Sequence, residues 1–260
     1  MSETTAAAES IREQALTAIS LLDLTSLDDA DTQQHIAALC RRAAAPAPDA
    51  PPVAAVCVFP RFASRARREL AGSRVRVACV AGDFPYGRAP LPAKVAEARR
   101  ALEDGADEID APIDREAFRA GEEERVAADI SALRDACGAA TLKVILETGE
   151  LGSDERIRRA AAIAIASGAD FLKTSTGKFP VGATPGAALL LLEAARDAER
   201  TTGRRIGVKV SGGIRRTDDA LAYLALARRV LGPSGGTPSR FRIGASALLD
   251  DLAAAAGAAR

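Results

Sequence analysis

Residues 169–178 read Ala-Asp-Phe-Leu-Lys-Thr-Ser-Thr-Gly-Lys, a short apolar run followed by hydroxyl side chains, a glycine and a second lysine. This pattern predicts a buried strand that ends in a polar loop. The two lysines, Lys173 and Lys178, stand out because the chain has only five lysines among its 35 lysine and arginine residues. Lysine, unlike arginine, can lose its proton and attack a carbonyl group. The stretch therefore indicates Schiff-base chemistry, although a lysine can also serve as an ordinary ion-pair partner.

The rest of the chain repeats this arrangement of an apolar strand followed by a helix. The start of the quoted stretch is the sixth predicted strand. The other seven predicted strands are 19–25, 53–59, 75–80, 108–111, 142–147, 206–210 and 241–244. The predicted helices are 10–18, 33–43, 60–71, 94–104, 115–137, 154–167, 185–201, 218–231 and one that begins at 246.

Eight strands that alternate with helices over about 250 residues are typical of an α/β protein with a (β/α)₈ barrel. We expect a single TIM-barrel domain over residues 1–260, with its core at about 18–252 and a short N-terminal helix. A doubly wound open sheet is disfavoured because no Gly-x-Gly-x-x-Gly follows the first strand.

Composition excludes several classes of function. The formal net charge is zero and no basic block is present, so we expect no nucleic-acid partner. No apolar run approaches the roughly 18 residues that span a bilayer, so we expect no membrane partner. Residues 1–10 show no secretory signal, which favours a cytoplasmic location.

The four cysteines lack Cys-x-x-Cys spacing and are expected to be free buried thiols, without a zinc site. The single histidine, His35, is expected to be a surface or packing residue, so acid–base chemistry falls to carboxylates, lysines, hydroxyls or water.

Charged residues alternate with apolar ones along several predicted strands, which places them on the barrel interior. This interior set is Asp23, Asp110, Lys143, Glu147, Lys173 and Lys209. We expect Lys143 to form a structural ion pair with Glu147 or Glu108, because unpaired buried charges are costly. Lys173 and Lys209 lie near the C-terminal ends of their strands, where such barrels place active sites. At about 6 Å and an effective dielectric of about 20, two ammonium groups repel by about 3 kcal/mol, which would lower each pKa by roughly two units.

Glycine-rich segments follow the last three predicted strands. They are Gly177-Lys178, Ser211-Gly212-Gly213-Ile214-Arg215 and Gly244-Ala245-Ser246. Glycine lets backbone N–H groups approach an anion, and a helix N-terminus after the last segment adds a favourable dipole. Loops after strands seven and eight commonly bind phosphate in this fold. The residues alone thus indicate a Schiff-base enzyme that acts on a phosphorylated carbonyl compound.

Several segments, in the same order along the chain, resemble the deoxyribose-phosphate aldolase family over about residues 20–250. They are 22–27, 56–60, 105–110, 142–151, 169–178, 207–209 and 212–215, and the Lys-Thr-Ser-Thr-Gly block is highly specific. The resemblance implies a class I aldolase that needs no metal or other cofactor. Such an enzyme reversibly cleaves 2-deoxy-D-ribose 5-phosphate to acetaldehyde and D-glyceraldehyde 3-phosphate, in deoxyribose phosphate catabolism. It implies phosphorylated sugars and aldehydes as ligands, and a homodimer or a monomer.

The resemblance also implies roles for individual residues. Lys173 would form the Schiff base, Lys209 would lower its pKa, and Asp110 would relay protons through a bound water. Asp23 would orient Lys209. The supporting pocket positions would be Thr25, Cys57 and Thr176. For Cys57 a second interpretation is equally good, namely that it is a buried thiol with no role in the pocket. The phosphate-binding positions would be Gly177, Lys178, Gly212, Gly213, Gly244 and Ser246.

The chain departs from the family pattern at several positions. Residues 83–87 read Asp-Phe-Pro-Tyr-Gly where many relatives have Asn-Phe-Pro-His-Gly. Val210-Ser211 and Ala247 also differ, which predicts weaker phosphate binding. Residues 253–260 contain no tyrosine, whereas some members end in one that assists proton transfer, so a slower enamine-forming step, or one that uses water alone, is our hypothesis. Two alternatives remain open: a Schiff-base barrel aldolase for a keto-acid or ketose phosphate, and a non-catalytic barrel that binds a sugar phosphate.

Overall fold

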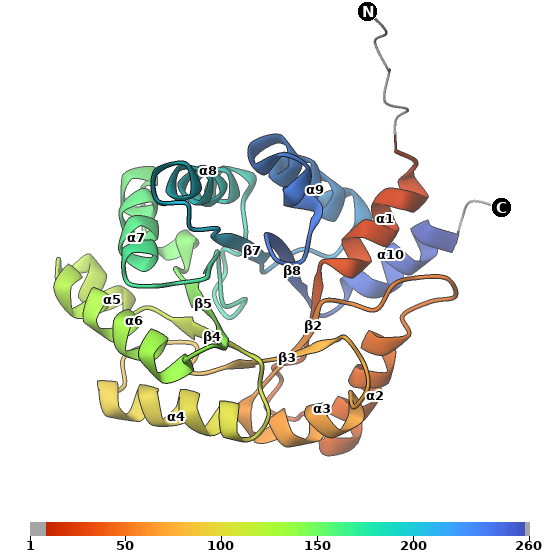
Figure 1. Ribbon diagram of the computed structural model, residues 1–260, viewed down its shortest axis with the longest axis horizontal. Coiled ribbons are helices and arrows are strands. Elements are labelled where there is room, and N and C mark those ends of the chain that lie inside the picture. Colours follow the sequence, from red (N-terminus) through yellow and green to blue (C-terminus); the bar gives the residue numbers. More distant parts are fainter. Residues whose placement is uncertain (1–8, 258–260) are drawn as a thin grey trace, which may run out of the picture.

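The structure, a computed structural model, describes residues 9–257. Eight parallel strands pair in chain order and close into a barrel, because β8 pairs with β1, and helices form a ring around it (Figure 1). The strands are β1 (Leu22–Thr25), β2 (Ala55–Val58), β3 (Arg76–Val80), β4 (Glu108–Pro112), β5 (Thr141–Ile145), β6 (Phe171–Lys173), β7 (Gly207–Ser211) and β8 (Phe241–Ala245). The predicted (β/α)₈ barrel is confirmed, and the open sheet is excluded.

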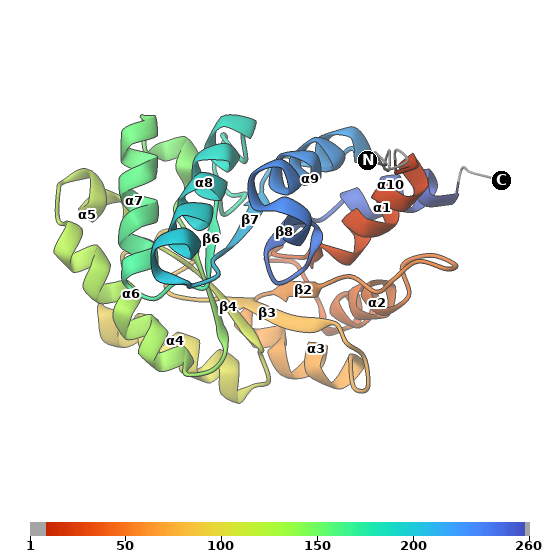
Figure 2. The same ribbon diagram turned by 45° about the horizontal axis from the view of Figure 1, so that its top comes forward.

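The predicted N-terminal helix is also present, and it covers one side of the barrel. This helix, α1 (Ile11–Ser20), lies beside the last helix, α10 (Leu248–Gly257), so the two ends of the described chain meet (Figures 1 and 2). The other helices are α2 (Gln33–Ala44), α3 (Ala63–Glu69), α4 (Leu91–Glu103), α5 (Arg115–Arg119), α6 (Glu123–Cys137), α7 (Asp154–Ala166), α8 (Pro185–Thr202) and α9 (Thr217–Leu231). None of the helices in residues 9–257 is both long and apolar enough to cross a membrane.

The element boundaries differ from prediction where local geometry intervenes. Ile19 and Ser20, the first two residues of the predicted first strand, belong to α1, and the strand begins only at Leu22. The predicted helix 115–137 is two helices, because Gly121 between them has a φ of 85° that a continuous helix does not allow. The helix predicted at 60–71 begins with a 3₁₀ turn, and the last helix begins at 248 instead of 246. The structure does not describe residues 1–8 and 258–260. Parts of the predictions about a secretory signal and a terminal tyrosine fall on these residues and so lie outside the described chain.

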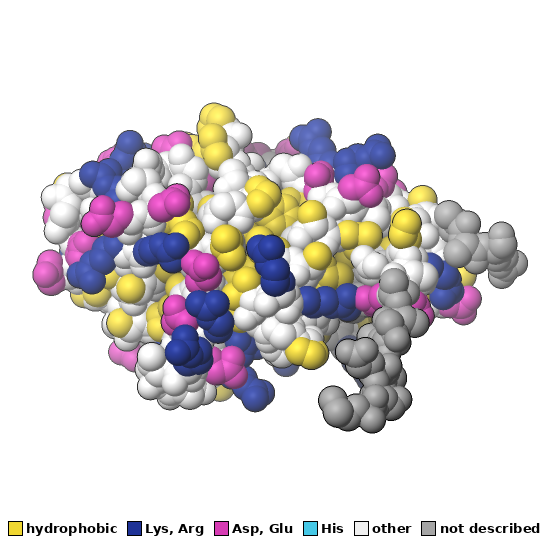
Figure 3. Space-filling view, turned by 90° about the horizontal axis from the view of Figure 1, so that it is seen from above, with side chains coloured by type: hydrophobic (Ala, Val, Ile, Leu, Met, Phe, Trp, Pro, Cys, Tyr) yellow, Lys and Arg dark blue, Asp and Glu magenta, His cyan; other side chains and the backbone are white. Residues whose placement is uncertain are grey.

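Apolar side chains fill the space between the strands and the surrounding helices and form the main hydrophobic core. Within the barrel, a smaller apolar cluster consists of Ala55, Cys57, Ala78 and Val80. All four cysteines are buried and free, as predicted. On the face shown in Figure 3, side chains of both charge signs are interspersed, which agrees with the zero net charge.

Candidate active site

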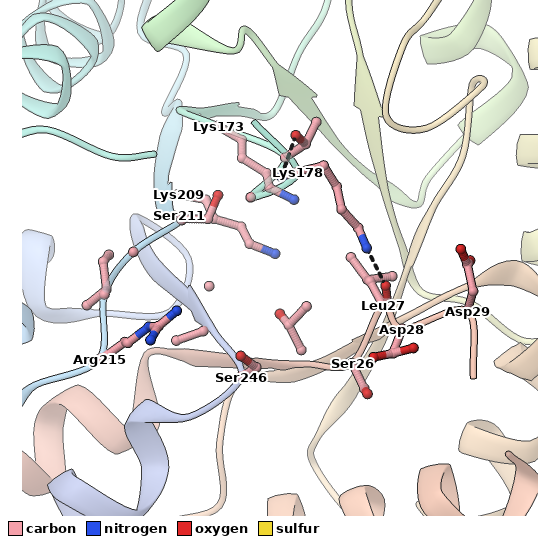
Figure 4. A pocket seen from close by; sticks show the side chains of 18 of the residues that line it. Ser26, Leu27, Asp28, Asp29, Lys173, Lys178, Lys209, Ser211, Arg215 and Ser246 are labelled. Carbon is pink, nitrogen blue, oxygen red and sulfur yellow. Dashed lines mark hydrogen bonds between the residues drawn. The ribbon is translucent and has the colours of Figure 1, made fainter. Parts of the chain in front are cut away.

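A cavity of about 540 Å³ lies at the C-terminal ends of the strands and brings together most of the predicted site residues (Figure 4). Thr25, Lys173, Thr176 and Lys209 line it. All of the predicted phosphate-binding positions also line it, namely Gly177, Lys178, Gly212, Gly213, Gly244 and Ser246. These residues come from the ends of β1, β6, β7 and β8 and from the loops after them. The closed barrel therefore collects segments that lie far apart in the sequence.

The two lysines lie side by side. Lys173 is the last residue of β6, and its register partner in β7 is Lys209. Both ammonium groups donate hydrogen bonds to Oδ2 of Asp110, Lys173 at 2.7 Å and Lys209 at 2.8 Å. Figure 4 shows the two side chains extending from their neighbouring strands toward the same space. Asp110 thus contacts both amines directly, whereas the resemblance implied a water between the carboxylate and its target.

These residues belong to a larger buried group, which we call the interior charge cluster. Its members are Asp23, Glu108, Asp110, Lys143, Lys173, Lys209 and Arg242, all of them at most 5% exposed. The cluster contains four cationic side chains but only three carboxylates. Because an uncompensated buried charge is costly, this composition favours the loss of one proton from a lysine.

Lys173 is the least compensated cation of this cluster. Among the described residues, its amine meets a single carboxylate within 4.0 Å, that of Asp110. Lys209 meets two, since it also contacts Asp23 at 2.6 Å, which places Asp23 where the resemblance implied. Lys143 meets three carboxylates, with Glu108 the closest at 2.5 Å. The geometry therefore selects Lys173 as the amine that is easiest to deprotonate.

The pKa shifts have the same pattern. Burial lowers the pKa of Lys173; Asp110 opposes this change and Lys209 adds to it, and the result lies below the usual value. Burial also acts to lower the pKa of Lys209, but Asp110 and Asp23 together raise it well above the usual value. The prediction that both lysines have a lowered pKa is therefore wrong for Lys209, because its pKa lies above the usual value. For Lys173 the direction is as expected, but burial is a larger cause than repulsion.

The expected partners of Lys143 are only partly correct. Lys143 pairs with Glu108 but not with Glu147, because β5 ends at Ile145 and Glu147 lies beyond it. Glu147 instead contacts Arg115 at 3.5 Å. The sequence interpretation missed Arg242, which pairs with Asp23 at 2.6 Å and with Glu108 at 2.9 Å. Its position between the apolar Phe241 and Ile243 in the eighth strand was the available signal.

Backbone geometry explains the glycines at the phosphate end. Gly177, Gly212 and Gly213 have φ values of 78°, 89° and 84°, in the left-handed region that favours glycine. Gly244 has a different reason to be glycine, since a Cβ there would lie 2.9 Å from the Cε atom of Lys209. Lys178 donates a hydrogen bond to the carbonyl of Leu27 at 2.6 Å across the cavity mouth (Figure 4).

Two further side chains lie at or beside the cavity. Cys57 does not line the cavity; it is fully buried in the small apolar cluster below, with its Sγ 3.9 Å from Asp110 Oδ2. Its burial agrees with the interpretation as a buried thiol and its contact with Asp110 agrees with a supporting position, so both interpretations stay predictions. His35 is a surface residue, as predicted, with a side chain that is 54% exposed; it lies at the edge of the cavity, where its Nδ1 is 2.6 Å from Asp31. A lone histidine in a helix carried no sequence signal for this position. Within residues 9–257, no group of three or more His, Cys, Asp and Glu side chains is arranged to hold a metal ion.

Comparisons with known proteins agree with this geometry. Residues 17–253 match the family described as DeoC/LacD family aldolase. A deoxyribose-phosphate aldolase from Agrobacterium fabrum (strain C58 / ATCC 33970) is 47% identical over 243 residues, which are 93% of this chain and 91% of the relative. The protein in a crystal structure from Toxoplasma gondii ME49 is 30% identical in sequence; the match covers 95% of each of the two chains and has a TM-score of 0.84. The deoxyribose phosphate aldolase from Aeropyrum pernix, described as a tetramer, is 26% identical, with 96% and 98% coverage and a TM-score of 0.73. The chain belongs to the DeoC/LacD family of aldolases.

Proposed function

We propose that this protein is a class I aldolase that reversibly cleaves 2-deoxy-D-ribose 5-phosphate into acetaldehyde and D-glyceraldehyde 3-phosphate. The observation that carries the proposal is the position of Lys173 at the floor of the cavity, with one carboxylate within 4.0 Å and a lowered pKa. A neutral lysine amine is a nucleophile toward carbonyl groups. The 47% identity to a deoxyribose-phosphate aldolase supports the choice of substrate.

The reaction begins when the Lys173 amine attacks the C1 aldehyde of the open-chain sugar. Protonation of the hydroxyl group of the resulting carbinolamine and departure of this group as water give a protonated imine. Removal of the proton from the C3 hydroxyl then breaks the C2–C3 bond, and the bonding electrons move into the imine to form an enamine. D-Glyceraldehyde 3-phosphate leaves at this step. Protonation of the enamine at C2 and hydrolysis of the imine release acetaldehyde and restore the amine.

Asp110 is the proposed proton relay for these steps. Its Oδ2 is 2.7 Å from the reacting nitrogen, which is within the range for direct proton transfer. Burial acts to raise the pKa of Asp110, but its three lysine neighbours outweigh burial and hold the pKa well below the usual value. The resulting carboxylate stabilises the positive charge of the imine. Lys209, which pairs with Asp23 at 2.6 Å, donates to the same Asp110 oxygen at 2.8 Å and so helps to fix the position of this carboxylate.

The glycine loops are the proposed binding site for the substrate phosphate. Gly177, Gly212 and Gly213 line the cavity, and Ser246, in the loop after the neighbouring strand β8, precedes the N-terminus of α10. Backbone N–H groups in such conformations, together with a helix N-terminus, favour an anion. Lys178 adds a positive charge at the cavity mouth. The substrate would therefore lie with C1 at Lys173 and its phosphate at the loops.

Borohydride reduction in the presence of acetaldehyde tests the proposal. We expect mass spectrometry of peptides to find a two-carbon adduct on Lys173 and on no other lysine. Lys173→Arg keeps the positive charge but cannot form an imine, so it should give no adduct and no cleavage of deoxyribose 5-phosphate. An adduct with a keto-acid or a ketose phosphate, without cleavage of deoxyribose 5-phosphate, would assign a different Schiff-base aldolase. Ligand binding without any adduct would assign a non-catalytic sugar-phosphate-binding protein.

A cytoplasmic location and a homodimeric or monomeric state stay predictions. Sedimentation analysis of the purified full chain would measure the oligomeric state directly.

A further inference from the structure

Glu147 is a buried carboxylate beside the cavity that the proposed mechanism does not use. It lies just after β5, and its side chain is 1% exposed. Its backbone is left-handed, with φ 53° and ψ 59°, a conformation that costs energy for any residue other than glycine. Burial raises the pKa of its carboxyl group, against the hydrogen bonds that Thr176 donates. A strained backbone at a buried carboxylate indicates that the position of this carboxylate is required.

One oxygen of Glu147 binds the loop after β6 directly. Its Oε2 accepts a hydrogen bond from the backbone N–H of Thr176 at 3.0 Å and another from the Thr176 hydroxyl at 2.5 Å. The same hydroxyl oxygen accepts a hydrogen bond from the backbone N–H of Lys178 at 3.1 Å. Glu147 is therefore connected, through Thr176, to the two residues 177–178 that line the phosphate end of the cavity.

Arg115 connects Glu147 to a second point on the same loop. The guanidinium of this α5 residue is 3.5 Å from Glu147 Oε2 and stacks on the ring of Phe179 at 4.0 Å from the ring centroid. The loop is thus held at Thr176 by Glu147 and at Phe179 by Arg115. Residues 177–178 lie between these two points. Lys173 is held separately, because it pairs with β5 and β7 in the barrel sheet.

We propose that Glu147 is a positioning residue that fixes the phosphate-binding segment 177–178 relative to the Lys173 amine, and thereby sets the preference for phosphorylated over unphosphorylated substrates. The proposal rests on the proposed aldolase function. Without the carboxylate, the segment 177–178 loses its attachment while the barrel still holds Lys173 in place. Binding of the phosphate should weaken, whereas the chemistry at the amine should continue.

The test compares Glu147→Leu, which removes the acceptor, with Glu147→Gln, which keeps an amide oxygen in its place. Glu150→Leu is the matched control, because Glu150 lies in the same turn but its carboxylate pairs with Arg119, at 4.0 Å, and its backbone hydrogen bond to Glu147 is kept in the variant. We expect Glu147→Leu to raise KM for deoxyribose 5-phosphate by on the order of tenfold or more. For unphosphorylated 2-deoxyribose, kcat/KM should stay within about twofold of wild type. Glu147→Gln should recover most of the loss, and Glu150→Leu should match wild type on both substrates.

Equal losses on both substrates would overturn the proposal and reduce Glu147 to a structural role, and so would an unchanged KM. Calorimetric titration with inorganic phosphate gives a readout that does not depend on catalysis. Weaker phosphate binding by Glu147→Leu supports the proposal, and equal binding overturns it, even if wild-type protein cleaves no deoxyribose 5-phosphate and the proposed substrate is wrong. If Glu147→Leu does not fold, Thr176→Val should show the same loss of phosphate binding and Thr176→Ser should restore it.

Discussion

Replacement of Lys209 by methionine should raise the pKa of Lys173. The two ammonium groups donate to the same oxygen of Asp110 at 2.7 and 2.8 Å, so they lie no more than about 5.5 Å apart. At about 5 Å and an effective dielectric of about 20, their repulsion is about 3 kcal/mol, or about two pKa units. The substitution also leaves three cations for three carboxylates in the interior charge cluster, which favours the protonated form of Lys173.

A raised pKa means that the neutral amine forms only at higher pH. We therefore expect kcat/KM for deoxyribose 5-phosphate to fall about 100-fold at pH 7 in Lys209→Met. The value should recover about tenfold per pH unit, with the acidic limb of the profile displaced upward by about two units. Coupled detection of glyceraldehyde 3-phosphate from about pH 6 to pH 10 measures the profile, and the rate of borohydride trapping with acetaldehyde reports the amine alone.

Lys94→Met is the matched control, since it removes a lysine that is also buried but that pairs with Asp129 outside the barrel interior, at 2.6 Å. This variant should keep the wild-type pH profile. If the acidic limb of the pH profile of kcat/KM stays at the same pH in Lys209→Met, the electrostatic reasoning is refuted, even if the maximum value of kcat/KM is lower. Lys209 would then act on catalysis by some means other than the charge of its amine.

Gly182→Ala should raise KM for the phosphorylated substrate by about tenfold, because its new Cβ would lie 2.3 Å from the carbonyl oxygen of Gly212 and displace that loop. Gly186→Ala, where a Cβ meets no atom within 4 Å, should leave KM unchanged, and equal effects of the two would contradict this account. Arg242→Met should lower the free energy of unfolding in urea by about 3–5 kcal/mol, since two buried carboxylates lose a cation, and a loss below about 1 kcal/mol would argue against the role of that pairing. Burial raises the pKa of all four cysteine thiols, so the folded protein should not react with Ellman's reagent near about pH 8, and a thiol that reacts before unfolding would show this to be wrong.

The fold was predictable because every strand carries an apolar face that can only pack beneath helices. The same alternation placed Lys173 and Lys209 correctly inside the barrel. Alternation gives the face of a strand but not the point at which the strand ends. This is why Glu147 was assigned to the interior set beside Lys143, although it lies past the end of β5 in a left-handed turn.

Relative heights inside the barrel, and with them the choice between Glu108 and Glu147 as the partner of Lys143, were beyond the sequence, because they depend on the stagger between neighbouring strands. Arg242 was missed for a second reason, since arginine is seldom buried and its pairing with Asp23 joins positions 219 residues apart. Only one of the two causes of the lowered Lys173 pKa could be inferred from the sequence. Charge repulsion can be inferred from two nearby lysines, but the extent of desolvation follows from the closed barrel itself.

The placement of the lysines has a consequence for a protein proposed to release aldehydes. Lys94, Lys143, Lys173 and Lys209 are each no more than 2% exposed, and the remaining lysine, Lys178, lines the cavity. Arginine supplies the positive charge of the exterior. Over the described part of the chain, reactive small molecules in the medium therefore meet hardly any side-chain primary amine outside the cavity. Cross-linking or immobilisation through lysine would be directed to the cavity mouth and would block the entrance before it modified the rest of the surface.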